Sequence, residues 1–179
     1  MRDTLHTPRL VLRRLRPEDA PALHELFSDP ETHTIGTGPV ASLARTEEWI
    51  GRRNAFHAET GLVWYGVWLR GGGPLVGNCG VFAGRTGRAG PEIGYEIRRS
   101  HQGRGLAAEA ARAVLAECDA VGIPRVWATI RPRNAASLAV AARLGLVHAH
   151  TRADERGELL YLARPRPPGA QALTTPGSS

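Results

Sequence analysis

The sequence contains no lysine, only two cysteines and no long apolar run. No stretch approaches the roughly 20 apolar residues that a membrane-spanning helix needs, and residues 1–7 lack the apolar core of a secretory signal. The two cysteines, Cys79 and Cys118, are too few for a disulfide framework, so we expect free thiols in a reducing compartment. These absences predict a cytoplasmic protein without membrane association.

The basic side chains are all arginines, 23 in number, and with 17 acidic residues they give a net charge of +6. A basic balance favours anionic partners in principle. The arginines are scattered along the chain, however, and a codon bias would remove lysine without any function. We therefore expect no specific nucleic-acid binding, although a basic RNA- or ribosome-associated module remains an alternative. Arginine also suits bidentate contacts with cofactor phosphates.

The length of 179 residues predicts one domain that buries its own core without a metal or disulfide. Apolar periodicity and turn residues predict strands at 9–15, 62–69, 75–82, 91–97, 125–130, 146–151 and 158–163, and helices at 17–27, 42–57, 103–121 and 134–144. Hairpins followed by helical crossovers indicate an α/β fold with a mixed, mostly antiparallel sheet flanked by helices. The domain is expected to span residues 1–165, with a disordered tail at 166–179.

A glycine turn after the strand at 91–97 is the most informative segment. It runs Gln102-Gly103-Arg104-Gly105-Leu106-Ala107 and opens the following helix. A helix N-terminus exposes unpaired backbone N–H groups and partial positive charge, and glycines there let a phosphate approach the backbone. The turn therefore suits a pyrophosphate, although a tight strand-to-helix connection alone would also account for the glycines.

The same segment matches a dinucleotide fingerprint. Residues 103–108 read G-x-G-x-x-A, a pattern that usually lies in a βαβ unit whose second strand ends near an acid that holds the ribose. Here the next strand ends Thr129-Ile130-Arg131, without an acid, and the strands before the turn are expected to be antiparallel. A nicotinamide cofactor is therefore disfavoured.

Residues 102–107 also satisfy every position of the Q/R-x-x-G-x-G/A signature of acetyl-CoA binding. With residues 7–13, 92–95, 134–137 and 143–146, the chain resembles the GNAT superfamily over about residues 5–165. The likeness is strongest to the branch that acetylates N-terminal amines of ribosomal proteins. It implies a single-domain acyl-CoA N-acyltransferase fold, acetyl-CoA as co-substrate, no metal, and an amine acceptor that is a protein N-terminus or a small molecule. A homodimer is left open.

The resemblance also implies which residues bind acetyl-CoA. Backbone N–H groups of residues 103–107 would hold the pyrophosphate, and the strand at Ile97 and Arg98 would run beside the pantetheine arm. Asn134 would reach the pantetheine or thioester, and Arg104 and Arg143 would contact CoA phosphates. The complete set is Ile97, Arg98, Gln102, Gly103, Arg104, Gly105, Leu106, Ala107, Asn134 and Arg143. The alternatives of a helix cap for Asn134 and a solvated arginine for Arg143 stay open.

Acetyl transfer needs a neutral amine, and a carboxylate acting through water would accept its proton. An α-amine, with a pKa of about 7.7–8.0, needs less help than a lysine at about 10.4. Glu92 is the favoured base, Glu96 is second and Glu158 on the closing hairpin is third. Glu92 and Glu96 share a face if their strand is regular. The resemblance implies a bulge there, which would change that phase and free an N–H to polarise the thioester carbonyl.

The leaving thiolate, with a pKa near 8.5, hardly needs an acid. Many GNAT enzymes place a tyrosine seven residues after the motif asparagine, where this chain has Ala141. In the ribosomal branch a serine takes that role, and the matching Ser137 lies one helical turn after Asn134. We expect Ser137 to act as a hydrogen-bond donor or relay. The missing tyrosine leaves a non-catalytic acyl-CoA-binding or sensing domain as the alternative function.

The acceptor pocket is expected from three segments: the loop at 31–41, the helix at 42–57 and the closing hairpin. His33, Trp49 and Trp64 would line it or else belong to the core or surface. No residue pattern identifies the acceptor.

Overall fold

The strands form one mixed sheet, which confirms the predicted α/β fold. The computed structural model describes residues 1–33, 38–88 and 90–164, where eight strands follow the order β1-β2-β3-β4-β5-β6-β8-β7. They are β1 (Thr4–His6), β2 (Leu10–Arg14), β3 (Trp64–Leu69), β4 (Leu75–Phe82), β5 (Glu92–Ile97), β6 (Trp127–Ile130), β7 (Val147–Asp154) and β8 (Gly157–Ala163). The helices are α1 (Ala20–Phe27), α2 (Leu43–Thr60), α3 (Leu106–Ala120) and α4 (Ala135–Arg143), with short 3-10 turns η1 (Pro17–Asp19) and η2 (Arg99–His101).

The pairing of β5 with β6 differs from every other pairing in the sheet. All other neighbours are antiparallel, whereas β5 and β6 run parallel and pair at a single position, Glu92 opposite Trp127. The backbone N–H of Trp127 donates to Pro91 O at 2.9 Å beside this pair. Beyond it the two strands diverge, so the middle of the sheet is open towards one end.

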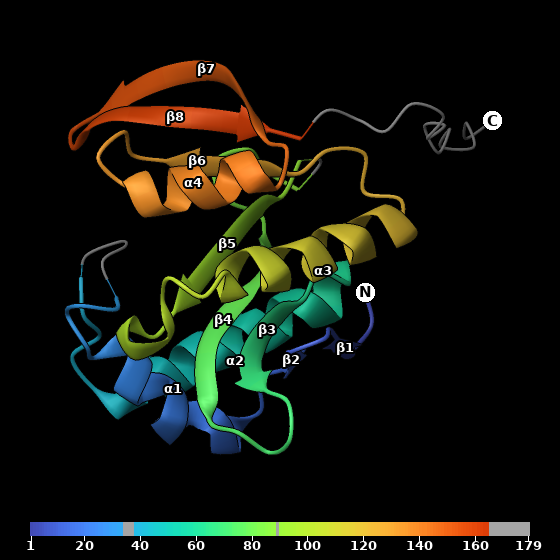
Figure 1. The fold of residues 1–179 in the computed structure, drawn as a ribbon, viewed down its shortest axis with the longest axis vertical. Helices are drawn as coiled ribbons and strands as arrows, with labels where there is room; N and C mark the ends of the chain where they lie inside the picture. The colour runs from blue at the N-terminus through green and yellow to red at the C-terminus, as the bar shows by residue number, and fades with distance from the viewer. Residues whose placement is uncertain (34–37, 89, 165–179) are drawn as a thin grey trace.

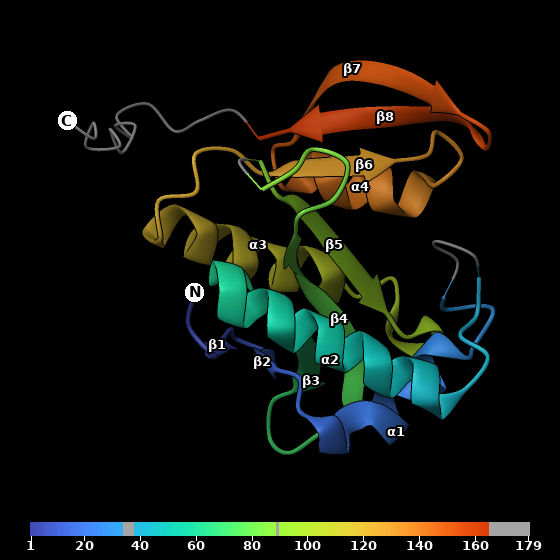
Figure 2. The same ribbon diagram turned by 180° about the vertical axis from the view of Figure 1, so that it is seen from behind.

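Helices cover both faces of the central strands. Figure 1 and Figure 2 show from opposite sides that α3 lies on one face and α1 with α2 on the other. Side chains alternate along a strand, so Tyr65 of β3 joins the larger apolar cluster with α3, whereas Trp64 joins a smaller cluster with α1 and α2. Each face of the sheet therefore has its own apolar core.

The two ends of the chain depart from the sequence-based expectation in different ways. The edge strand β1 was not predicted, because its three residues are too few to show a periodic pattern. A long-range contact holds the segment before it, since Arg2 donates from its backbone and its side chain to Glu117 of α3 at 2.6 and 2.8 Å. The expected tail at 166–179 lies outside the described residues.

The predicted N-cap of α2 is confirmed, but the predicted bounds of α2 and α3 differ from those observed. The side chain of Ser42 caps α2 as expected, but that helix continues to Thr60, where Gly61 ends it with a φ of +72°. Helix α3 begins at Leu106 rather than at residue 103, because Gly103 and Gly105 have left-handed φ values. Within the described residues no helix is long and apolar enough to cross a membrane.

The bulge expected in β5 is absent from its pairing with β4. The register runs without a shift from Gly77 opposite Ile97 to Phe82 opposite Glu92. Glu92 and Glu96 therefore point to the same face, as a regular strand requires. The open edge of β5 arises instead from the divergence of β6.

Both cysteines are free and buried, as expected. Burial raises the pKa of Cys118 to about 12. Burial, together with the neighbouring Cys118, raises the pKa of Cys79 well above its usual range. Since the thiolate is the reactive form, neither cysteine is a nucleophile at neutral pH.

We expect neither cysteine of the native protein to react with a chromogenic disulfide reagent at neutral pH, while both react after denaturation. Absorbance with and without guanidinium measures this directly. One rapidly reacting thiol in the native protein would contradict the burial and the raised pKa values.

Candidate active site

Two cavities lie on either side of the gap between β5 and β6. The first, of about 450 Å³, lies at the N-terminus of α3. The second, of about 530 Å³, lies between the two strands and the β7–β8 turn. Tyr95, Asn134 and Ser137 line both cavities, so the cavities meet at these side chains. This arrangement allows two ligands to approach one point from two different cavities.

The first cavity contains an uncapped helix N-terminus. The N-cap residue of α3 is Gly105, and no side chain accepts a hydrogen bond there. The N–H groups of residues 106–108 therefore lack intrahelical acceptors, and all three residues line the cavity. Gly103 also lines it, with a φ of +75° and open space where a Cβ would be. Such a turn fits a phosphate, because N–H groups and the helix dipole both favour an anion.

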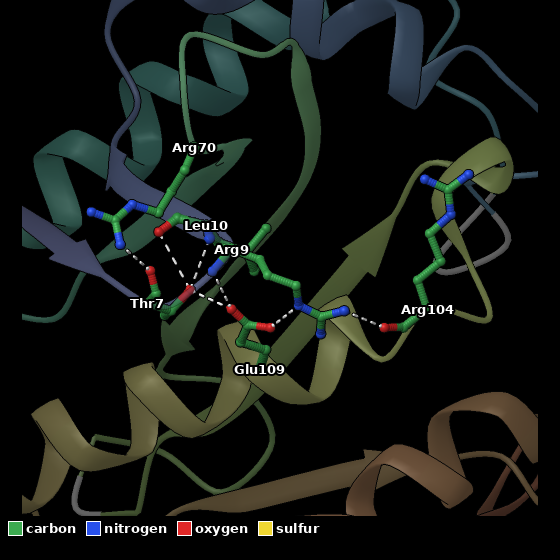
Figure 3. A network of polar contacts seen from close by, with 6 residues as sticks. All are labelled: Thr7, Arg9, Leu10, Arg70, Arg104 and Glu109. Atoms are coloured by element: carbon green, nitrogen blue, oxygen red, sulfur yellow. Dashed lines mark hydrogen bonds and ion pairs between the residues drawn. The ribbon is translucent and has the colours of Figure 1, made fainter.

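A network around Glu109, in the first turn of α3, holds this turn in place (Figure 3). Glu109 accepts hydrogen bonds at 2.6 Å from the Thr7 hydroxyl and from Arg9 Nε. Arg9 Nη1 also donates to Arg104 O at 2.9 Å, so the guanidinium joins the glycine turn to the helix. Burial raises the pKa of Glu109, but the hydrogen bonds from Thr7 and Arg9 outweigh it and leave that pKa below its ordinary value. Thr7 and Arg9, noted in the sequence only as part of a resemblance, are positioning residues.

The cations around the first cavity differ in part from those predicted. Arg143 lines it, as does Arg99, which was not predicted. Arg104 is exposed and lies outside the cavity lining, and its backbone carbonyl accepts from Arg9. A phosphate contact by the Arg104 side chain therefore stays a prediction.

The open edge of β5 presents backbone groups to the gap. The N–H of Arg98 donates to Val76 O of the β4 side at 2.8 Å. Because backbone direction alternates along a strand, Tyr95 and Ile97 direct their N–H groups towards the gap. The carbonyl of Ile97 accepts from Gln102 Nε2 at 2.8 Å, which ties the glycine turn to the strand. Ile97 lines the cavity and Arg98 does not.

Three polar groups meet where the cavities join. Asn134 Oδ1 accepts from the backbone N–H of Ser137 at 3.0 Å, so Asn134 caps α4. The Tyr95 hydroxyl donates to the Ser137 carbonyl at 2.9 Å, and burial raises the pKa of Tyr95. Ala141, where many GNAT enzymes have a tyrosine, is fully buried. Tyr95 therefore brings a phenol to this point from β5, a role that the sequence did not indicate.

The candidate carboxylates have unlike surroundings. Glu92 is 1% exposed, outside both cavity linings, and accepts from Thr129 Oγ1 at 2.6 Å and from the Thr86 N–H at 3.1 Å. Glu96 lines the first cavity, and its Oε1 lies 2.9 Å from His33 Nδ1. Glu158 is exposed on β8 and outside both linings.

The aromatic residues proposed for the acceptor pocket belong largely to the smaller core. Trp64 is buried, donates to Asn78 Oδ1 at 3.0 Å and packs edge-on against Trp49. Asn78 in turn donates to Glu96 at 3.2 Å. Trp49 and Trp64 thus act on Glu96 only through Asn78, whereas His33 contacts Glu96 directly. Residues 34–37 of the predicted pocket loop lie outside the described residues.

Comparison with known proteins identifies this arrangement. The family described as acetyltransferase (GNAT) domain matches residues 9–147. The chain belongs to the GNAT acetyltransferase family. The predicted fold and N-acetyltransferase class are thereby confirmed.

Relatives cover most of this GNAT chain. The uncharacterised N-acetyltransferase p20 of Bacillus licheniformis is 30% identical over 140 residues, 76% of this chain and 78% of the relative. An acetyltransferase structure from Agrobacterium tumefaciens C58 has a TM-score of 0.79 at 28% identity, covering 93% of this chain and 96% of that one. RimL, a ribosomal L7/L12 alpha-N-protein acetyltransferase solved with coenzyme A, has a TM-score of 0.78 at 22% identity, covering 88% and 94%. The RimL likeness concerns the fold, and it places a ribosomal-protein acetyltransferase among the structural neighbours, as the resemblance predicted.

Ala107→Glu tests whether the N-terminus of α3 binds a phosphate. The variant should still fold, because an acidic residue in the first turn of a helix is favourable. We expect CoA affinity to fall by about 100-fold or more, since the carboxylate takes the phosphate's place. Ala107→Gln, of the same size but neutral, should lose much less. Calorimetry with CoA measures both, and equal affinities in folded Ala107→Glu and wild type would contradict the placement.

Glu109→Gln should destabilise the fold by about 1–3 kcal/mol at pH 7, because it removes a charged acceptor from three donors. The folded pKa of Glu109 is lowered from 4.5. Its stabilisation is therefore present above the unfolded pKa and is lost as pH falls through the folded one. Urea unfolding should show the difference from wild type shrinking below pH 4.5. Exposed Glu47→Gln is the control, and a pH-independent difference would contradict the network.

Proposed function

We propose that this GNAT acetyltransferase moves the acetyl group of acetyl-CoA to a primary amine by direct attack on the thioester. A protein N-terminal α-amine is the first acceptor class to test, because solved neighbours include RimL. The observation that supports direct transfer is the junction of two cavities at Tyr95, Asn134 and Ser137. One cavity suits the coenzyme and the other leaves room for the amine.

The first cavity matches the demands of coenzyme A. The amides of residues 106–108 and the glycine turn suit the pyrophosphate. Arg143 and Arg99 supply positive charge beside it. The open N–H groups of Tyr95 and Ile97 suit a pantetheine arm that pairs with β5 as an added strand would. Acetyl-CoA, when bound, supplies the activated acetyl group at the junction.

We infer that Glu96 rather than Glu92 accepts the amine proton, directly or through a water. A general base must come within reach of the proton that it takes. Glu96 lines a cavity and contacts His33, whereas Glu92 is enclosed by Thr86 and Thr129. As the amine nitrogen bonds to the acetyl carbon, the carbon–sulfur bond breaks and the thiolate leaves. The Ser137 hydroxyl lies at the junction, where it can donate a hydrogen bond or relay a proton to the thiolate.

Thiol release from acetyl-CoA over a panel of amines tests the function. The proposal requires release above background with at least one amine and a product heavier by one acetyl group in mass spectrometry. CoA binding without release over the whole panel would favour a sensing domain of the same fold.

Glu96→Gln should lower kcat by about 100-fold with little change in CoA affinity, because the base is lost. Glu92→Gln is the matched comparison and should lower stability while leaving kcat nearly unchanged. If folded Glu92→Gln showed the large loss of kcat and Glu96→Gln did not, Glu92 would be the base.

Ser137→Ala should lower kcat by about 10-fold while CoA affinity changes little, since the hydroxyl acts on the leaving sulfur rather than on the phosphates. Steady-state kinetics and CoA titration separate the two effects. Equal losses in both would make Ser137 a binding residue instead.

A further inference from the structure

The second cavity is lined by cations from four different segments. Its lining includes Arg85 after β4, Arg131 after β6, Arg133 before α4 and Arg156 in the β7–β8 turn. No aspartate or glutamate belongs to this lining among the residues that the structure describes. The face from which the acceptor would enter is therefore electropositive.

One of these arginines has a structural task. Arg131 Nη2 contacts both carboxylate oxygens of Asp154, at 2.7 and 2.6 Å, and Nη1 donates to the carbonyls of Gly157 and Glu158. These contacts hold the β7–β8 turn against β6. The charge of Arg131 is thereby balanced by Asp154.

Arg85 and Arg133 are left without such a partner. Arg85 donates to Thr129 Oγ1 at 3.5 Å, and within the described part of the chain neither Arg85 nor Arg133 forms an ion pair. Both are exposed. Glu92 is buried behind Thr129, which already donates to it at 2.6 Å. Two guanidinium groups at the mouth of the cavity are therefore available to a ligand.

This charge has two opposite effects on an amine acceptor. Nearby cations lower the pKa of an amine and so favour the neutral, nucleophilic form. The same cations repel an ammonium ion that carries no compensating negative charge. Because one positive field causes both effects, an acceptor that arrives as an ammonium ion is attracted to this cavity only if it also brings an anionic group for the arginines.

We propose that the acceptor carries a carboxylate or phosphate near its reactive amine, and that Arg85 and Arg133 bind this group. The inference rests on the proposed amine acetylation and specifies its substrate class. The planar guanidinium forms paired hydrogen bonds with either anion. A peptide with acidic residues directly after its N-terminus and a small phosphorylated amine both present this chemistry.

Matched acceptor pairs distinguish charge from shape. One pair is a peptide beginning Ser-Asp-Asp against the same peptide beginning Ser-Asn-Asn, and the other is phosphoethanolamine against ethanolamine. In at least one pair the acidic member should have a kcat/KM about 10-fold or more above the neutral one, as expected for hydrogen bonds between charged groups. The preference should decline as salt rises from about 20 mM to about 500 mM. The pair that reacts better identifies the source of the anion.

The double variant Arg85→Gln/Arg133→Gln should abolish this preference while the KM for acetyl-CoA stays within about twofold, because neither arginine lines the coenzyme cavity. The double variant Arg45→Gln/Arg112→Gln changes two exposed arginines outside both cavities and controls for net charge. Equal rates within both pairs, or a preference that survives Arg85→Gln/Arg133→Gln, would overturn the inference alone. CoA binding without transfer to any amine would overturn the proposed function and this inference with it.

Discussion

The single pairing of β5 with β6 is the constraint on which the site depends. Glu92 lies opposite Trp127, and its buried carboxylate accepts a 2.6 Å hydrogen bond from Thr129 across the two strands. The link joins the halves of the sheet at one end and leaves them apart at the other. Both cavities exist because the strands are joined there and diverge beyond it.

Positive groups line both cavities, whereas the point where the cavities meet is neutral. On the α3 side, uncapped helix N–H groups and Arg143 suit a phosphate. In the second cavity, Arg85 and Arg133 belong to the lining. The junction is lined by neutral groups, among them Tyr95. An amine that arrives there meets a surrounding that favours loss of its proton, with Glu96 close by to accept it.

Local signals in the sequence were reliable where local chemistry decides the structure. The glycine turn and the caps Ser42 and Asn134 were predicted, because each depends on neighbours within a few residues. The contact of Arg9 with Glu109 joins residues 100 positions apart, so no sequence window contains it. The uneven surroundings of the candidate carboxylates arise in the same way, from strands and loops that meet only in the folded chain. The bulge in β5, taken over from a resemblance, was wrong, because β5 pairs with β4 without a register shift and its other edge is open only where β6 diverges.

A crystal structure of the protein with coenzyme A tests the central claim most directly. The account predicts the pyrophosphate against the backbone N–H groups of residues 106–108 and the pantetheine along the open edge of β5, with the sulfur at Tyr95 and Ser137. Coenzyme bound elsewhere, or a sulfur remote from the junction of the two cavities, would contradict it.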